Sequence, residues 1–193
     1  MNKQKIQYPP GDFSIWIIIY VELVTFGLFF IGFAFSRKEQ VEIFNASQLL
    51  LDQRFGFINT ILLITSSYFV VKAVTIIKTI NTQESFKKAS IYLVSAIGLG
   101  GIFLIIKVIE FSDKYSQGIN LSTNSFFMFY FILTIFHFMH VILGMIILYN
   151  LYLNTKVGLY TKKEHRGLET GASYWHMVDL LWIVLFPLIY IIR

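Results

Sequence analysis

The chain has no cysteine, only three prolines and few charged residues. Without cysteine it can form no disulfide, no thiolate metal centre, no iron–sulfur cluster and no CxxCH haem attachment. Asp, Glu, Lys and Arg together make up 14% of its 193 residues, whereas a soluble domain has about 25%. Apolar residues instead reach 56%. This composition is typical of a membrane protein.

Five apolar runs are close to or above the ~20 residues that a helix needs to cross about 30 Å of hydrocarbon. They lie near residues 13–35, 55–77, 89–109, 126–153 and 173–192. In lipid, backbone N–H groups must be satisfied within their own segment, and these runs lack the alternation of barrel strands. The connections are too short for a soluble domain. We therefore expect an all-α membrane protein with five transmembrane helices in one transmembrane domain, residues 1–193.

Lysine and arginine are distributed unequally between the two ends of the expected helices. The N-terminus, loop 78–88 and loop 154–172 carry nine of them, and the opposite loops with the C-terminus carry five. Because basic loops stay in the cytoplasm, we expect the N-terminus inside and the C-terminus outside. This topology signal, with attraction to anionic headgroups, explains the net charge of +5 at pH 7. We expect no nucleic-acid partner.

Three charged side chains interrupt the first and third runs. Glu22 lies near the middle of the first run, where a carboxylate is costly to ionise. It is either a proton-linked, carbodiimide-reactive carboxyl or a protonated glutamic acid that is hydrogen-bonded to another helix. Lys107 and Glu110 close the third run at i, i+3 spacing, which puts them on one helix face and predicts that they pair.

The last two runs carry His137 with His140, and His176 with Asp179, again at i, i+3 spacing. Two imidazoles on one helix face could ligate a metal, with His176, Asp179 and Glu169 as further ligands. They could not both bind one haem, because axial ligands approach a haem from opposite faces. Alternatively, the buried Asp179 accepts a hydrogen bond from His176 and both pairs serve helix packing. The spacing leaves both interpretations open. Pro187, further along, is expected to kink the last helix.

Read together, the segments YVELVTFGLFF (20–30), FHFMHVILG (136–144) and HRGLETGASYWHMVDLLW (165–182) resemble the haem–copper oxidase subunit III family. The residues that fit its two C-terminal motifs are Phe136, His137, His140, Val141, Gly144, Glu169, Tyr174, Trp175, His176, Val178, Asp179 and Trp182. Glu110 fits a family glutamate at the end of the preceding helix, and Glu22 fits its carbodiimide-reactive membrane glutamate. The five helices are similar to the shorter bacterial form. The PPGDFSIW opening, Lys107 and the LFPLIYIIR ending look closest to a nitric-oxide-reductase-associated (NorE-type) branch.

The resemblance implies an accessory, non-catalytic subunit in the bacterial inner membrane. Its partner would be the catalytic haem-binding membrane subunit of a haem–copper oxidase or nitric oxide reductase, and haem and metal would sit in partner subunits. The family implies a V-shaped cleft with bound phospholipid and no cofactor in this chain. It favours a buried polar network of Glu110, His137, His140, Glu169, His176 and Asp179 that fixes helix packing, with Glu22 as a proton-linked or carbodiimide-reactive carboxyl.

Two other classes of function stay open on the sequence. The first is an independent ion or small-solute transporter that uses Glu22, Lys107 and Glu110, although inverted repeats typical of transporters are missing. The second is a haem b or quinone-binding membrane protein, for which His137 with His176 would be the cross-helix histidine pair.

Overall fold

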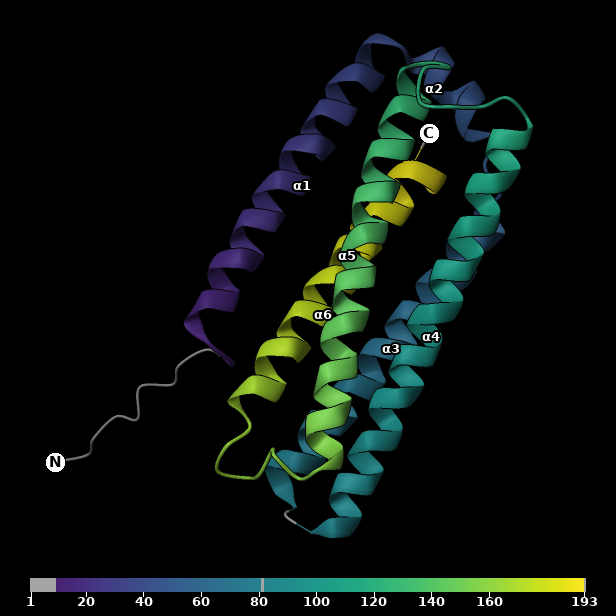
Figure 1. Cartoon of the computed structure of the whole chain (residues 1–193). Helices are drawn as coiled ribbons and strands as arrows, with labels where there is room; N and C mark the ends of the chain where they lie inside the picture. The colour runs from purple at the N-terminus through teal and green to yellow at the C-terminus, as the bar shows by residue number, and fades with distance from the viewer. Residues whose placement is uncertain (1–9, 81, 193) are drawn as a thin grey trace, which may run out of the picture.

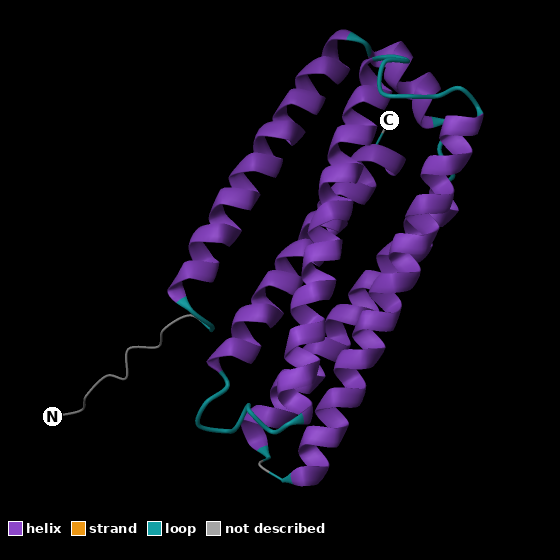
Figure 2. Ribbon diagram, viewed as in Figure 1, coloured by secondary structure: helices purple, strands orange, loops and turns teal. Residues whose placement is uncertain are grey.

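The computed structural model describes residues 10–80 and 82–192, and this part of the chain is helical (Figure 2). Its long helices are α1 (Phe13–Glu39), α3 (Gln53–Thr79), α4 (Gln83–Ser116), α5 (Ser125–Lys156) and α6 (Arg166–Phe186). A short helix α2 (Val41–Gln48) joins α1 to α3, and a π-helix η1 (Pro187–Ile191) continues α6. By length and composition, α1, α3, α4, α5 and α6 with η1 are each able to cross a membrane. The expected all-α membrane fold is therefore confirmed.

The helices are longer than the apolar runs from which they were expected. α4, for example, begins at Gln83 and ends at Ser116, whereas its apolar run covers 89–109. Polar flanks continue a helix as long as its backbone hydrogen bonds can form, so hydropathy marks the spanning part and not the ends. The amphipathic α2 was not expected, because eight residues are too few for a membrane run.

Four of the helices form a closed bundle, in which α3 packs on α4, α4 on α5, α5 on α6 and α6 on α3 (Figure 1). α1 lies outside this bundle against α5 and α6, and α2 crosses one end and contacts α5. The connections α3–α4 and α5–α6 lie at the same end, opposite to α2. The described helices thus form one four-helix bundle with α1 along its side.

Polar side chains cap the starts of α4 and α5, and a glycine follows the end of α4. Asn124 accepts a hydrogen bond from the N–H of Phe127, 2.9 Å away, and so caps α5. Thr82 and Ser85 exchange hydrogen bonds in a capping box that starts α4. Gly118, with φ of +74°, turns the chain out of α4, because a residue without Cβ adopts this left-handed backbone without strain.

The ring of Trp175 in α6 fills the space between α4 and α5. A Cβ on Gly144 would lie 2.8 Å from this ring, and a Cβ on Gly100 would lie 3.0 Å from it. Both glycines therefore let three helices approach one tryptophan. A Cβ on Gly98 would meet nothing within 4 Å, so the glycines of this segment are not equivalent.

The expected break at Pro187 takes the form of the π-helix η1, in which the N–H of Ile192 donates to the carbonyl of Pro187 at 2.9 Å. Proline has no N–H for the regular helical ladder, and a wider turn follows it. Two side-chain amides satisfy carbonyls at this end of the chain. Gln48 donates to Ile189 O at 2.8 Å and Gln53 donates to Tyr190 O at 2.7 Å. η1 is therefore held against α2 and the start of α3.

Candidate functional site

A buried cluster of charged and phenolic side chains lies between α4, α5 and η1. Lys107 Nζ is 3.0 Å from Glu110 Oε2 and donates to the hydroxyl of Tyr190 at 2.7 Å. The other carboxylate oxygen, Glu110 Oε1, accepts hydrogen bonds from Tyr130 at 2.8 Å and from Tyr190. Lys107 and Glu110 are only 1% and 2% exposed. The expected pairing of these two residues is confirmed, and it occurs in the interior.

Aromatic rings complete the surroundings of the Lys107 ammonium. Its Nζ lies 4.8 Å from the ring centroid of Trp182 and 5.2 Å from that of Tyr190, with Phe111 and Tyr130 slightly further away. Cation–π attraction of this kind is strongest where the cation is desolvated. Both charges are therefore compensated by protein groups, which is the condition under which a buried ion pair is tolerated.

Glu22 of α1 contacts α5 through His140. Glu22 Oε2 is 3.0 Å from His140 Nε2, and His140 Nδ1 is 2.7 Å from the backbone oxygen of Phe136. A carbonyl oxygen can only accept, so Nδ1 carries a hydrogen in this geometry. The contact at Nε2 then needs one further proton, on Glu22 or on His140. The Glu22–His140 contact therefore links α1 to α5.

The contact between α1 and α5 is otherwise aromatic. The ring centroids of Phe26 and Phe136 are 5.2 Å apart, and those of Phe26 and His140 are 5.6 Å apart. Phe33 continues the same face toward Phe129 at 5.9 Å. The Glu22–His140 pair is thus the polar link in an apolar seam between α1 and the bundle.

His137 is completely buried, and neither ring nitrogen has a hydrogen-bond partner among the described residues. The ring of Trp182 lies 5.3 Å from the His137 ring at an interplanar angle of 31°, and Phe103 contacts it edge-on at 5.8 Å. These side chains occupy the space beside the imidazole. The surroundings of His137 therefore fit side-chain packing between aromatic rings of α4 and α6.

His176 and Asp179 do not form the hydrogen bond that their spacing suggested. His176 Nδ1 is 3.8 Å from Asp179 Oδ2, whereas its hydrogen bond is with Ser67 Oγ of α3. Packing of α3 on α6 brings the serine hydroxyl closer than the carboxylate one turn away. The hydrogen bond between Ser67 and His176 thus joins α3 to α6, whereas the expected contact was within α6.

Glu169, at the start of α6, joins three parts of the chain. Its Oε1 is 2.6 Å from Lys78 Nζ of α3 and 3.6 Å from His165 Nε2, and its Oε2 accepts from the N–H of Gly11 at 3.3 Å. It therefore ties the segment before α1 and the end of α3 to α6. Lys3, Lys5 and Pro9, which entered the topology and branch arguments, lie outside the described residues.

The six residues expected in one buried network consequently belong to separate groups. Glu110 lies with Lys107, His140 with Glu22, and Glu169 with Lys78. His176 lies with Ser67 and, at 3.8 Å, with Asp179, while His137 packs between aromatic rings. Within residues 10–80 and 82–192, no three His, Asp or Glu side chains gather as a metal site would require. What these groups share is that each links different helices.

A family model described as cytochrome c oxidase subunit III matches residues 13–193. The chain belongs to this family. It is 32% identical over 136 residues to cytochrome c oxidase subunit 3 of Synechocystis sp.. The aligned region covers 70% of this chain and 55% of the Synechocystis protein. It is 29% identical over 197 residues to cytochrome bo(3) ubiquinol oxidase subunit 3 of Buchnera aphidicola, covering 97% of this chain and 89% of that protein. It is also 28% identical to the haem–copper oxidase subunit I+III of Aeropyrum pernix.

These relatives differ in length. The chain spans about half of the Synechocystis subunit and 22% of the fused Aeropyrum protein, but most of the Buchnera subunit. The match across 13–193 includes every long helix, so the family assignment covers α1 as well as the bundle.

Sequence reasoning missed several partners that give the charged residues their roles. Tyr190 lies after the break at Pro187 and has no spacing relationship to Glu110. Ser67 and Lys78 are ordinary polar residues of a spanning helix until α6 packs against them. Tyr130 could have been suspected as a partner from the sequence, because it shares one face of its helix with His137. In the structure its hydroxyl donates to Glu110 of α4.

Proposed function

We propose that this chain is an accessory, cofactor-free membrane subunit of a terminal respiratory oxidoreductase, and that it stabilises the catalytic haem-binding subunit. The observation that carries the proposal is the family match over residues 13–193. The Aeropyrum relative is a haem–copper oxidase subunit I+III, a chain named for both subunits. We extend that arrangement to this chain as a separate subunit beside a subunit I partner.

The contacts within the bundle support a stabilising role. Lys107 and Glu110 are paired inside the bundle, and Glu169 joins three segments of the chain. Ionisable groups that transfer solutes usually line a water-filled path. A transporter that relies on Lys107 and Glu110 is therefore the less favoured alternative.

Glu22 is the residue that we propose for a proton-linked role. Its carboxylate lies 3.0 Å from His140 Nε2, and the Glu22 side chain is 23% exposed, so a partner subunit against α1 could reach it. Supply of protons or of a small substrate to the catalytic subunit would use this edge of the molecule. Carbodiimide modification of Glu22, and its loss in Glu22→Gln, would test whether the carboxyl is protonated and accessible.

Orientation in a bacterial inner membrane is part of the same proposal. The α3–α4 and α5–α6 connections lie at one end of the bundle (Figure 1). The basic residues in these connections or in the adjoining helix ends are Lys78, Lys87, Lys88, Lys156, Lys162, Lys163 and Arg166. This end is proposed to face the cytoplasm, with the N-terminus on the same side. The lipid cleft that the resemblance implies stays a prediction.

Affinity purification of the tagged full chain from its native membranes in mild detergent tests the proposal. We expect a haem-containing catalytic subunit to co-purify, and its identity distinguishes an oxidase from the nitric oxide reductase suggested by the NorE-type resemblance. The chain separated from that partner is expected to show no Soret band and no copper. Stoichiometric haem in the isolated chain, or liposome flux by the chain alone that Glu22→Gln abolishes, would contradict the proposal.

A further inference from the structure

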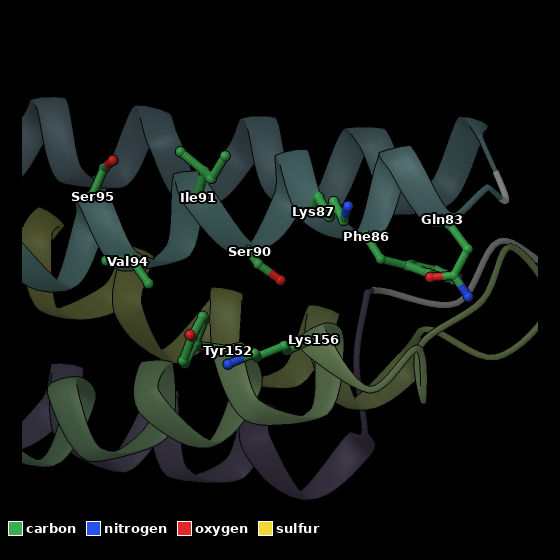
Figure 3. Close-up of a pocket in the computed structure, with 9 residues that line it drawn as sticks. All are labelled: Gln83, Phe86, Lys87, Ser90, Ile91, Val94, Ser95, Tyr152 and Lys156. Atoms are coloured by element: carbon green, nitrogen blue, oxygen red, sulfur yellow. The ribbon is translucent and has the colours of Figure 1, made fainter.

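A groove of about 550 Å³ lies between α4 and α5 at the basic end of the bundle. Figure 3 shows Ser90 of α4 and Tyr152 and Lys156 of α5 pointing into the space between the two helices. Lys87 lies on α4 one turn before Ser90. Further along the bundle the groove is lined by Ile91 and Val94 and, at its far end, by Ser95.

Two cations of this groove have no carboxylate partner in the described part of the chain. Lys88, the neighbour of Lys87, is paired with Glu84 at 2.7 Å, but Lys87 and Lys156 form no ion pair among residues 10–80 and 82–192. Lys156 Nζ lies 5.8 Å from the ring centroid of Tyr152. The groove therefore has positive charge beside an aromatic ring at one end and an apolar surface at the other.

Ser90 supplies an independent observation. Its residue is 8% exposed, and its hydroxyl has no hydrogen-bond partner in the described part of the structure. Serine in a spanning helix commonly donates to the carbonyl four residues earlier, as Thr134 does to Tyr130. The Ser90 hydroxyl instead points into the groove (Figure 3), and an unsatisfied polar group in hydrocarbon is costly.

We propose that this groove binds one anionic phospholipid, with the phosphate between Lys87, Lys156 and Ser90 and the acyl chains along Ile91 and Val94. A phosphodiester accepts hydrogen bonds from ammonium and hydroxyl donors, which is the chemistry that these side chains offer. Basic pockets between spanning helices at the cytoplasmic side have the charge that anionic headgroups need. The proposed lipid site lies between α4 and α5, two adjacent helices of the four-helix bundle. Binding of a lipid there is an addition to the proposed accessory role.

Lipid titration of the purified full chain in mild detergent, followed by native mass spectrometry, tests this site. Phosphatidylglycerol and phosphatidylcholine with the same acyl chains are compared. The groove variant is Lys87→Gln/Lys156→Gln, and the matched control is Lys162→Gln/Lys163→Gln, which removes the same charge from the loop at the same end. Lys87 and Lys156 are exposed, so their replacement leaves the core packing intact.

We expect the wild-type chain to prefer phosphatidylglycerol and the groove variant to bind it about tenfold or more weakly, with the control within about twofold. Ser90→Ala, which changes no charge, should weaken phosphatidylglycerol binding by about threefold. Equal affinity for the two lipids would overturn the proposal. An equal loss of phosphatidylglycerol affinity in the loop control would also overturn it, because the lipid would then be attracted to the basic end in general and not to the groove. If the chain dimerises through α4 and α5 and takes up no lipid there, a second copy occupies the groove and the proposal is wrong.

Discussion

The buried pair of Lys107 and Glu110 gives the sharpest prediction about stability. Lys107→Met and Glu110→Gln each leave one polar partner without its counterpart inside the bundle. The Lys107 ammonium donates to Glu110 and Tyr190, and the Glu110 carboxylate accepts from Lys107, Tyr130 and Tyr190. Because the two side chains are 1% and 2% exposed, neither can turn toward lipid headgroups or water for compensation.

Loss of one member of a buried ion pair costs about 3–5 kcal/mol, whereas replacement of both members by neutral groups of similar size is far less costly. The two single variants differ in what remains. In Lys107→Met, Glu110 can take up a proton and keep both tyrosine hydrogen bonds. In Glu110→Gln, the amide has only one acceptor oxygen, so its N–H₂ donor faces either Lys107 or the tyrosine hydroxyls, and the Lys107 ammonium loses its counter-charge. We therefore expect Glu110→Gln to be the more destabilising single change.

Thermal unfolding of the full chain in one mild detergent, followed by circular dichroism, measures the effect. For a chain of about 200 residues, 3 kcal/mol corresponds to a fall in Tm of roughly 6–12 °C. The double variant Lys107→Met/Glu110→Gln should lose about 2–3 kcal/mol less than the sum of the two single variants. Lys72→Met is the matched control, because Lys72 is exposed in α3, and it should change stability by no more than about 0.5 kcal/mol.

Two results would refute this reasoning. The first is a change of less than about 2 °C in both single variants, which would mean that the charges are solvated in the membrane despite their burial in the bundle. The second is strict additivity in the double variant, which would mean that each residue acts through separate contacts. A Glu110→Gln variant that is more stable than Lys107→Met would contradict only the expected order.

Two further changes test the packing of α6 and η1. Gly144→Ala should lower Tm, because the new methyl would lie 2.8 Å from the Trp175 ring, whereas Gly98→Ala, with nothing within 4 Å, should raise stability by up to about 1 kcal/mol through helix propensity; equal effects of the two changes would be against the close approach. Gln48→Leu leaves the Ile189 carbonyl without its 2.8 Å hydrogen bond and should cost about 1–3 kcal/mol, with faster hydrogen exchange confined to η1 as the distinguishing readout.

The local features of the chain could be predicted well. A spanning helix follows from an apolar run of sufficient length, because the lipid solvent leaves the backbone few alternatives. The Lys107–Glu110 contact follows from i, i+3 spacing, and the break at Pro187 follows from a missing N–H. Each of these depends on residues within about one helical turn of one another.

Contacts across helices were the part that spacing could not supply. His176 has Asp179 at the same spacing as the pair in α4, yet its hydrogen bond goes to Ser67, 109 residues away. The family resemblance pointed to Glu22, but it did not identify His140 as the partner of that carboxyl. Which helix faces meet depends on the packing of the whole bundle.

The sequence by itself determined a membrane protein of five spanning helices, its basic end and its family, because hydropathy, charge and motif are properties of short segments. Only the tertiary structure decided which polar groups satisfy each other. The residues expected in one network belong to several groups that link different helices. The hydroxyl of Ser90, which has no hydrogen-bond partner in the described part of the chain, lies in the groove that Lys156 also lines. The physical reason is that hydrocarbon penalises every unpaired polar group, while the identity of its partner is set by side chains that approach from other helices.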